Sequence, residues 1–281
     1  MKSNNKKFFL SFFTTFILGS TFLLSQAHAE GSHKLSTIGV QLYSLRTEAE
    51  NGVEAVLKNV SAMGYQQVEL HTLYDMSAAE LRKLLDKYDL KAPSTHRGFK
   101  LIKEDVNGTI ADAKALGLDL VIVPWLDIKE YNTKEKWVAF ASELNTVGKK
   151  LKESGIRLAY HNHDFEFKAL KDGSIPYDVL LANTNPQYVS LQLDLFWIIK
   201  AGKDPLAYMK ANSGRIVSVH VKDMTADGEM TEVGAGKIDF AKIFKVGHHN
   251  GLQYFIVEHD KPAKPLASVE TSIKYLRKLE Y

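Results

Sequence analysis

From Ile38 onward, the chain alternates eight times between a short β-branched or apolar run and a longer stretch with helical periodicity. This alternation is typical of a parallel sheet covered by helices. The expected strands begin near Ile38, Gln67, Lys91, Leu120, Ile156, Tyr188, Ile216 and Tyr254. Eight such units in about 250 residues favour an α/β fold with a single (β/α)8 TIM barrel over residues 30–281. An open doubly wound sheet is the alternative, but no glycine-rich phosphate loop follows the first strand.

Several helices have recognisable start signals. Asp204 precedes Pro205, which places an N-cap residue directly before a proline at the first helical position. Capping-box spacing occurs three times, at Asn51 with Glu54, Ser77 with Glu80, and Asn132 with Glu135. Trp137 falls within the helix expected after Asn132, where a core position is more typical than a binding role.

The first 29 residues have the features of a signal peptide. Three lysines at positions 2, 6 and 7 precede an uncharged run from Phe8 to Leu24, and Ala27-His28-Ala29 has the small-x-small form of a cleavage site. We expect cleavage before Glu30, export to the periplasm, and no stable membrane insertion afterwards. An uncleaved membrane anchor is the alternative, although a short run diluted by Ser and Thr spans a bilayer poorly.

Composition excludes several classes of function. The chain has no cysteine, which removes disulfides, thiolate catalysis and zinc-thiolate sites. Its formal net charge is only +3, so no nucleic-acid partner is indicated. We expect a small-molecule partner, and the sequence leaves open whether the chain forms a homo-oligomer.

Polar side chains recur where the predicted strands end. In a (β/α)8 barrel these carboxyl ends carry the chemistry. Side chains alternate between the two faces of a strand, so Glu69 and His71 share one face while Val68 and Leu70 take the other. The polar set therefore points into the barrel mouth. Its members are Gln41, Tyr43, Glu69, His71, Ser94, His96, Trp125, the run His161–Glu166, Gln192, Asp194, His220, Lys222, Glu258 and Asp260.

Converging acidic groups from several strands repel one another unless a cation lies between them. From the last four strands we predict a single divalent-metal site with Glu166, Asp194, His220 and Glu258 as ligands. Three carboxylates and one imidazole suit Mn²⁺, Mg²⁺ or Co²⁺, with Zn²⁺ also compatible. For each residue taken alone, a structural role or a supporting role behind the ligands remains open.

At these residues the chain resembles the xylose-isomerase-like TIM barrels, a superfamily that includes sugar phosphate isomerases/epimerases, inosose dehydratase and isomerase, 3-keto-glycoside lyases and endonuclease IV. The similarity extends over essentially the whole chain after residue 29. It is carried by IGVQLYSLR (38–46), GYQQVEL (64–70), GIRLAYHNHDFEF (155–167), LDLFWIIKAG (193–202), VSVHVKD (217–223) and YFIVEHD (254–260).

The resemblance implies the same four ligands and gives Glu166 and Glu258 a second role as the acid/base pair on opposite faces of a sugar. His161 and His163 stand close to Glu166 and can replace it or bind substrate. The residues expected to bind substrate are His71, His96, Trp125, His161, His163, Trp197, Lys222 and Asp260. Alternatives stay open for two of them, because Lys222 can pair with Asp223 or Asp260 and His71 can pack behind the site.

The implied function is a metal-dependent isomerase or epimerase that moves a proton next to the carbonyl of a free or keto sugar. The alternative with the same metal and base is a 3-keto-glycoside lyase or hydratase, acting by β-elimination. A phosphoesterase or abasic-site nuclease would need a histidine-richer multi-zinc site and a basic groove. A non-catalytic sugar-binding protein is the alternative from a different class.

Overall fold

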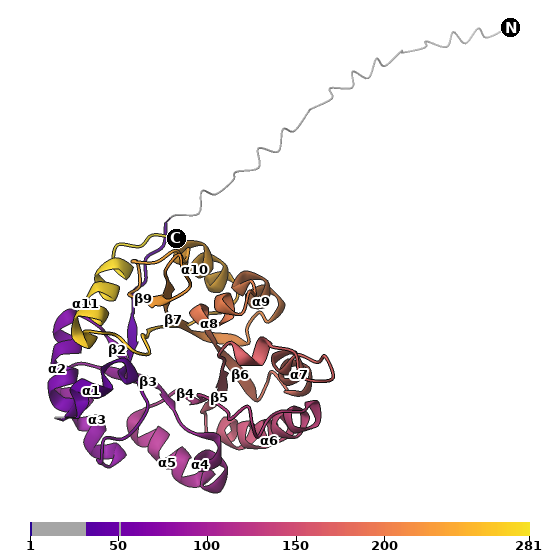
Figure 1. Ribbon diagram of the computed structural model, residues 1–281, viewed down its shortest axis with the longest axis horizontal. Helices are drawn as coiled ribbons and strands as arrows, with labels where there is room; N and C mark the ends of the chain where they lie inside the picture. Colours follow the sequence, from indigo (N-terminus) through magenta and orange to yellow (C-terminus); the bar gives the residue numbers. More distant parts are fainter. Residues whose placement is uncertain (2–31, 51) are drawn as a thin grey trace. The chain divides into compact units, whose positions relative to one another are not determined.

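A computed structural model describes Met1, residues 32–50 and residues 52–281. Its eight main strands are all parallel and close into a barrel, with helices around the outside (Figure 1). Around the barrel the order is β1 (Gly39–Gln41), β10 (Tyr254–Val257), β7 (Ile216–Val221), β6 (Val189–Asp194), β5 (Arg157–His161), β4 (Leu120–Val123), β3 (Lys91–His96) and β2 (Gln67–Leu70). The predicted TIM barrel is thus confirmed, and every strand begins within one residue of its predicted start.

The helices fill the connections between the strands. They are α1 (Arg46–Ala49), α2 (Val53–Met63), α3 (Ala78–Lys87), α4 (Phe99–Glu104), α5 (Val106–Leu116), α6 (Lys134–Glu153), α7 (Pro176–Asn183), α8 (Leu195–Lys200), α9 (Pro205–Ala211), α10 (Phe240–His249) and α11 (Pro265–Leu276), with short 3₁₀ turns η1 (Leu42–Leu45) and η2 (Phe165–Phe167). Among these described helices, none is long and apolar enough to cross a membrane. The predicted signal peptide lies, apart from Met1, outside the described residues.

Two of the four predicted helix starts are present. Ser77 forms a complete capping box with Glu80, and the Asp204 side chain accepts from the Leu206 N–H next to Pro205. The prediction at Asn132 is wrong by one residue, because Thr133 is the N-cap of α6 and accepts from the Lys136 N–H. Asn51 lies outside the described residues.

Alternation along the strands separates the barrel interior from the layer beneath the helices. Leu120, Ile122, Ala159 and Val217 form a small apolar cluster of their own, whereas Val121 belongs to the larger core packed against the helices. Trp137 is fully buried in that larger core, as its mid-helix position predicted. The apolar residues thus fill the barrel and leave its carboxyl-end mouth to the polar side chains.

A short antiparallel hairpin follows β7, formed by β8 (Asp223–Met224) and β9 (Met230–Thr231). The buried carboxylate of Asp223 accepts four backbone N–H groups, those of Met224, Gly234, Gly236 and Ile238, at 2.8 to 3.1 Å. This anchoring fixes the hairpin, so that Met230 lines the mouth and its sulfur accepts from the Asp260 N–H at 3.2 Å.

Candidate active site at the barrel mouth

The side chains at the carboxyl ends of the strands meet around one cavity of about 1250 Å³. Most of the predicted site residues line it, namely His71, His96, Trp125, His161, His163, Trp197, Lys222, Glu258 and Asp260. Asp194 and His220 are fully buried, and they contact Lys222 and Glu258 of this set. Of the predicted set, Glu166 is the one residue that takes no part in this arrangement.

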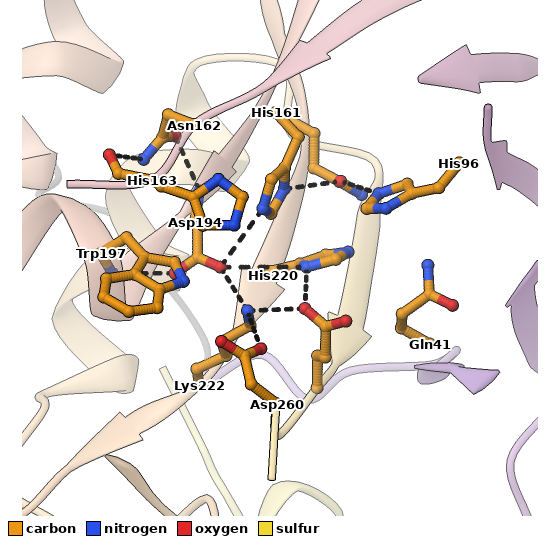
Figure 2. Close-up of polar contacts among 12 residues, drawn as sticks. Gln41, His96, His161, Asn162, His163, Asp194, Trp197, His220, Lys222 and Asp260 are labelled. Carbon is orange, nitrogen blue, oxygen red and sulfur yellow. Dashed lines mark hydrogen bonds and ion pairs between the residues drawn. The ribbon is translucent and has the colours of Figure 1, made fainter. Parts of the chain in front are cut away.

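The ammonium of Lys222 lies among three carboxylates (Figure 2). Its Nζ is 2.9 Å from Asp194 Oδ2, 2.6 Å from Glu258 Oε2 and 2.6 Å from Asp260 Oδ1. Burial by itself lowers the pKa of Lys222, but the three carboxylates outweigh burial and raise the pKa well above its usual value. The pairing with Asp260 that the sequence left open is therefore present, and Lys222 is a buried cation.

Asp194, His220 and Glu258 each present one ligand atom within 4.8 Å of the others. His220 Nδ1 lies 2.7 Å from Glu258 Oε2 and 3.9 Å from Asp194 Oδ2. Asp194 Oδ2 and His220 Nδ1 are buried atoms without a well-directed hydrogen bond. Their charged neighbours are Lys222 for Asp194 and Glu258 for His220. Such atoms are costly unless a further group, such as a metal ion, satisfies them. These three residues therefore fit a divalent cation.

The other nitrogen of His220 is held by Glu69, which is fully buried in β2. His220 Nε2 lies 2.6 Å from Glu69 Oε1, so an N–H on Nε2 leaves Nδ1 free to face the acidic group. A carboxylate behind a histidine in this way is the usual support of a metal-binding imidazole. Glu69 was noted in the sequence only as a polar strand end.

Glu69 is also the centre of a wider hydrogen-bond network. Its carboxylate accepts from Gln41 Nε2 at 2.8 Å, Ser94 Oγ at 2.6 Å and Gln192 Nε2 at 2.8 Å, and lies 3.0 Å from His96 Nε2. Burial raises the pKa of Glu69, but His96 and His220 outweigh burial and hold it well below its usual range. Glu69 is thus an ionised anchor that ties five of its neighbours together.

His161, the last residue of β5, lies beside Asp194 and His220 of the acidic group. Its Nδ1 lies 3.0 Å from Gln192 Oε1, and its Nε2 lies 3.7 Å from Asp194 Oδ2 (Figure 2). Because the Gln192 amide donates to Glu69 and Ser218, its oxygen must accept from His161, which leaves His161 Nε2 with a free lone pair. His161 is therefore placed to add a fourth ligand from β5.

A second cluster, formed by His96, His161 and His220, also has three ring nitrogens within 4.8 Å. His161 and His220 of this cluster are shared with the acidic group, whereas His96 Nε2 is engaged by both Gln192 and Glu69. We therefore assign His96 to the supporting network and not to a separate metal site.

The structure places the predicted ligand Glu166 outside the two candidate ligand groups. The chain leaves β5 after His161 and turns through η2, which places the Glu166 carboxylate against Tyr160, whose hydroxyl donates at 2.9 Å, and against the His163 N–H at 2.8 Å. Tyr160 packs against Trp137 and Phe140 beneath the helices. Burial raises the pKa of Glu166 to about 8. Glu166 is thus a largely protonated structural residue at neutral pH, outside both candidate ligand groups.

The walls of the mouth carry polar atoms without a partner. Among the described residues, His163 Nδ1 and Trp197 Nε1 are buried and unpaired, and the two rings lie 5.5 Å apart. Burial lowers the pKa of His163 to about 3, so its ring is neutral. His71 contacts Tyr43 and Tyr74 edge to face and lines the cavity. These atoms suit the hydroxyl groups and C–H faces of a sugar.

Comparison with known proteins points in one direction. A family model described as Xylose isomerase-like TIM barrel matches residues 57–279. Inosose dehydratases from Clostridium beijerinckii and Clostridium perfringens are similar to the chain, with 24% and 25% identity over 270 residues that cover 81% of this chain and 90% of theirs.

Solved structures agree with the barrel. A sugar phosphate isomerase/epimerase from Parabacteroides distasonis superposes with a TM-score of 0.76 at 27% identity, covering 86% of this chain and 98% of that one. An IolI protein solved with a bound zinc atom superposes with a TM-score of 0.63 at 17% identity, covering 85% and 95%. The Parabacteroides protein is similar to this chain in both sequence and fold. The IolI protein, at its lower identity, shows only that the fold is shared.

Proposed function

Because the chain belongs to the xylose isomerase-like TIM barrel family, we propose that it is a metal-dependent lyase acting on a keto sugar or keto polyol. In this reaction a proton leaves the carbon next to a carbonyl, and an oxygen substituent is expelled from the neighbouring carbon. The relatives named inosose dehydratase support an elimination, and the site geometry supplies the residues for it.

The proposed ligands are His161, Asp194, His220 and Glu258, one from the carboxyl end of each of the last four barrel strands. Asp194 Oδ2 and His220 Nδ1 support this set, because both atoms are buried, face the acidic group and are held by ion-pair contacts with Lys222 and Glu258 rather than by well-directed hydrogen bonds. These residues would hold a divalent cation, which would supply Lewis-acid chemistry towards a carbonyl oxygen of the substrate. The imidazole of His161 replaces the carboxylate predicted at Glu166.

The chain's own residues account for the remaining steps. Glu258 lines the cavity and accepts the proton from carbon, and the electron pair of that C–H bond becomes the new C=C bond. The C–O bond on the adjacent carbon breaks, and its electrons leave with the oxygen. The departing oxygen takes up a proton, which the neutral ring of His163 can relay from solvent, while the charge of Lys222 stabilises the developing anion.

The observation that carries the proposal is the position of Glu166. Epimerisation by proton exchange needs a base on one face of the carbon and an acid on the other. The residue expected to form that pair with Glu258 is bonded to Tyr160 and the His163 N–H instead. An elimination needs only one carboxylate base, together with a proton source for the leaving group.

The test uses the purified chain loaded with Mn²⁺, Co²⁺ or Zn²⁺ and a panel of 3-keto-glucosides, 2-keto-inositol and free ketoses in D₂O. We expect an unsaturated ketone and released water or alcohol from the keto substrates, with loss of both in Glu258→Gln. Epimers carrying deuterium, without elimination, would replace the lyase proposal with an epimerase. Sugar binding without carbon-hydrogen exchange would indicate a binding protein.

A further inference from the structure

The proposed metal site already contains a positive charge of its own. Lys222 directly follows β7, and its side chain is only 1% exposed. Its Nζ lies 2.9 Å from Asp194 Oδ2 and 2.6 Å from Glu258 Oε2, and both residues are proposed ligands. Two cations at the same carboxylates repel each other, and a buried site screens that repulsion only weakly. Lys222 and a divalent ion therefore compete for Asp194 and Glu258.

The third partner of Lys222 lies outside the proposed ligand set. Asp260 Oδ1 is 2.6 Å from Lys222 Nζ, and Asp260 belongs to neither group of candidate metal ligands. In Figure 2, Asp194 and Asp260 approach the Lys222 ammonium from opposite sides. Lys222 can therefore keep its bond to Asp260 when Asp194 binds another cation.

The backbone around Asp260 is held by contacts that do not involve the proposed ligands. The Asp260 N–H donates to the sulfur of Met230 in the β8–β9 hairpin at 3.2 Å. The preceding N–H, that of His259, donates to Ser44 Oγ at 3.0 Å. Because these contacts fix the segment on both sides of the barrel mouth, the position of the Asp260 carboxylate does not depend on a bound ion.

We propose that Asp260 is a positioning residue, which holds Lys222 beside the metal ligands and prevents it from displacing the ion. The inference rests on the proposed function, and it gives Asp260 a role other than the substrate contact expected from the sequence. With Asp260 in place, the charge of Lys222 stays next to the reaction centre, where the leaving oxygen becomes negative. Without it, the anionic partners left to Lys222 among the described residues are Asp194 and Glu258, so Lys222 competes more strongly for them.

The experiment measures the affinity of the metal-free chain for Co²⁺ by calorimetric titration. Asp260→Asn should weaken binding about tenfold or more, which is the usual effect of removing a residue that supports metal ligands. Lys222→Met should bind Co²⁺ more tightly than the wild type, because the competing cation is gone. In that background Asp260→Asn should weaken binding by about threefold at most, since only the charge of Asp260 itself is then lost.

Asp75→Asn is the matched control. It makes the same chemical change at an exposed residue that lines the same cavity, and it should alter the Co²⁺ affinity by less than about twofold. Lys222→Gln provides a second background should Lys222→Met fail to fold, which circular dichroism checks. The absorption spectrum of bound Co²⁺ should be the same in Asp260→Asn and in the wild type, because the ligands are unchanged.

An equal loss of affinity with and without Lys222 would show that Asp260 acts on the ion through its own charge, and would overturn its role through Lys222. Unchanged affinity in Asp260→Asn would overturn that role as well. A changed Co²⁺ spectrum in this variant would make Asp260 a ligand instead. Each of these results leaves the lyase proposal intact, whereas failure of the wild-type chain to bind Co²⁺, Mn²⁺ or Zn²⁺ would refute the proposed function itself.

Discussion

Replacement of Glu166 by glutamine tests whether this residue is a buried, protonated structural carboxyl or an ionised metal ligand or base. Burial raises the pKa of Glu166 from 4.5 to about 8. Between these values the unfolded chain loses the proton and the folded chain keeps it, so wild-type stability falls as pH rises from 4.5 to 8. At about 1.4 kcal/mol for each pH unit, the fall amounts to as much as about 5 kcal/mol.

Glu166→Gln removes this titration. At pH 5 the variant should be less stable than the wild type by about 1–2 kcal/mol, because its amide cannot accept from both Tyr160 and the His163 N–H. The deficit should vanish or reverse by pH 8, where the wild type has lost the contribution of the protonated carboxyl. Urea unfolding at pH 5, 6, 7 and 8 measures the difference.

The matched control is Glu54→Gln, which removes an exposed carboxylate of α2 paired with Lys87. The pKa of Glu54 is lowered by hydrogen bonds from Lys87 and Tyr88, so its removal should produce no gain in relative stability between pH 4.5 and 8. A pH-independent stability difference for Glu166→Gln would show that Glu166 is ionised in the fold. Loss of bound metal in the same variant would restore Glu166 as a ligand.

Three further predictions concern the site, the packing and the leader. Glu69→Gln should weaken binding of Mn²⁺ or Zn²⁺ by about 10- to 100-fold in calorimetric titration, because it withdraws the carboxylate behind His220, and unchanged affinity would contradict the supporting role. Gly148→Ala should lower the unfolding free energy by about 1–3 kcal/mol, since the added Cβ would lie 2.3 Å from the Tyr188 carbonyl oxygen; an unchanged urea midpoint would refute this close packing. The full-length chain expressed in a Gram-negative bacterium should be recovered from the periplasm with Glu30 as its first residue by intact-mass measurement, and a cytoplasmic chain retaining residues 1–29 would refute export.

Much of the site was predictable because side chains along a strand alternate between its two faces. Glu69, Asp194, His220 and Lys222 lie on or directly beside regular strands, so counting by two places them all toward the barrel interior. Glu166 does not obey this rule, because it lies five positions beyond the last residue of β5, within the 3₁₀ turn η2. Once the chain leaves the strand, position in the sequence no longer determines the face, and the burial of the Tyr160 side chain decides where the carboxylate goes.

The sequence predicted that the residues of the supporting network lie at the barrel mouth. It did not predict which of them are hydrogen-bonded to one another. Gln41, Glu69, Ser94 and Gln192 come from four different strands, and their mutual bonds depend on the register of the closed barrel. The alternation of strands and helices carries no information on that register. The hairpin β8–β9 was likewise not predicted, because its strands have only two residues each and depend on Asp223 for their position.

Charge balance offers a reason for an imidazole at the end of β5. Three carboxylates, those of Asp194, Glu258 and Asp260, surround Lys222, and without a cation the His220 pKa rises to about 10 because burial is outweighed by Glu258 and Glu69. A divalent ion at the proposed ligands would displace the extra proton of His220, and together with Lys222 it would balance those three negative charges. The ionised Glu69 behind His220 already adds one carboxylate beyond these three, so a further carboxylate from β5 would add a second uncompensated charge to a buried site, which is costly. A neutral His161 supplies a ligand atom without that cost, and the protonated Glu166 adds no charge behind it.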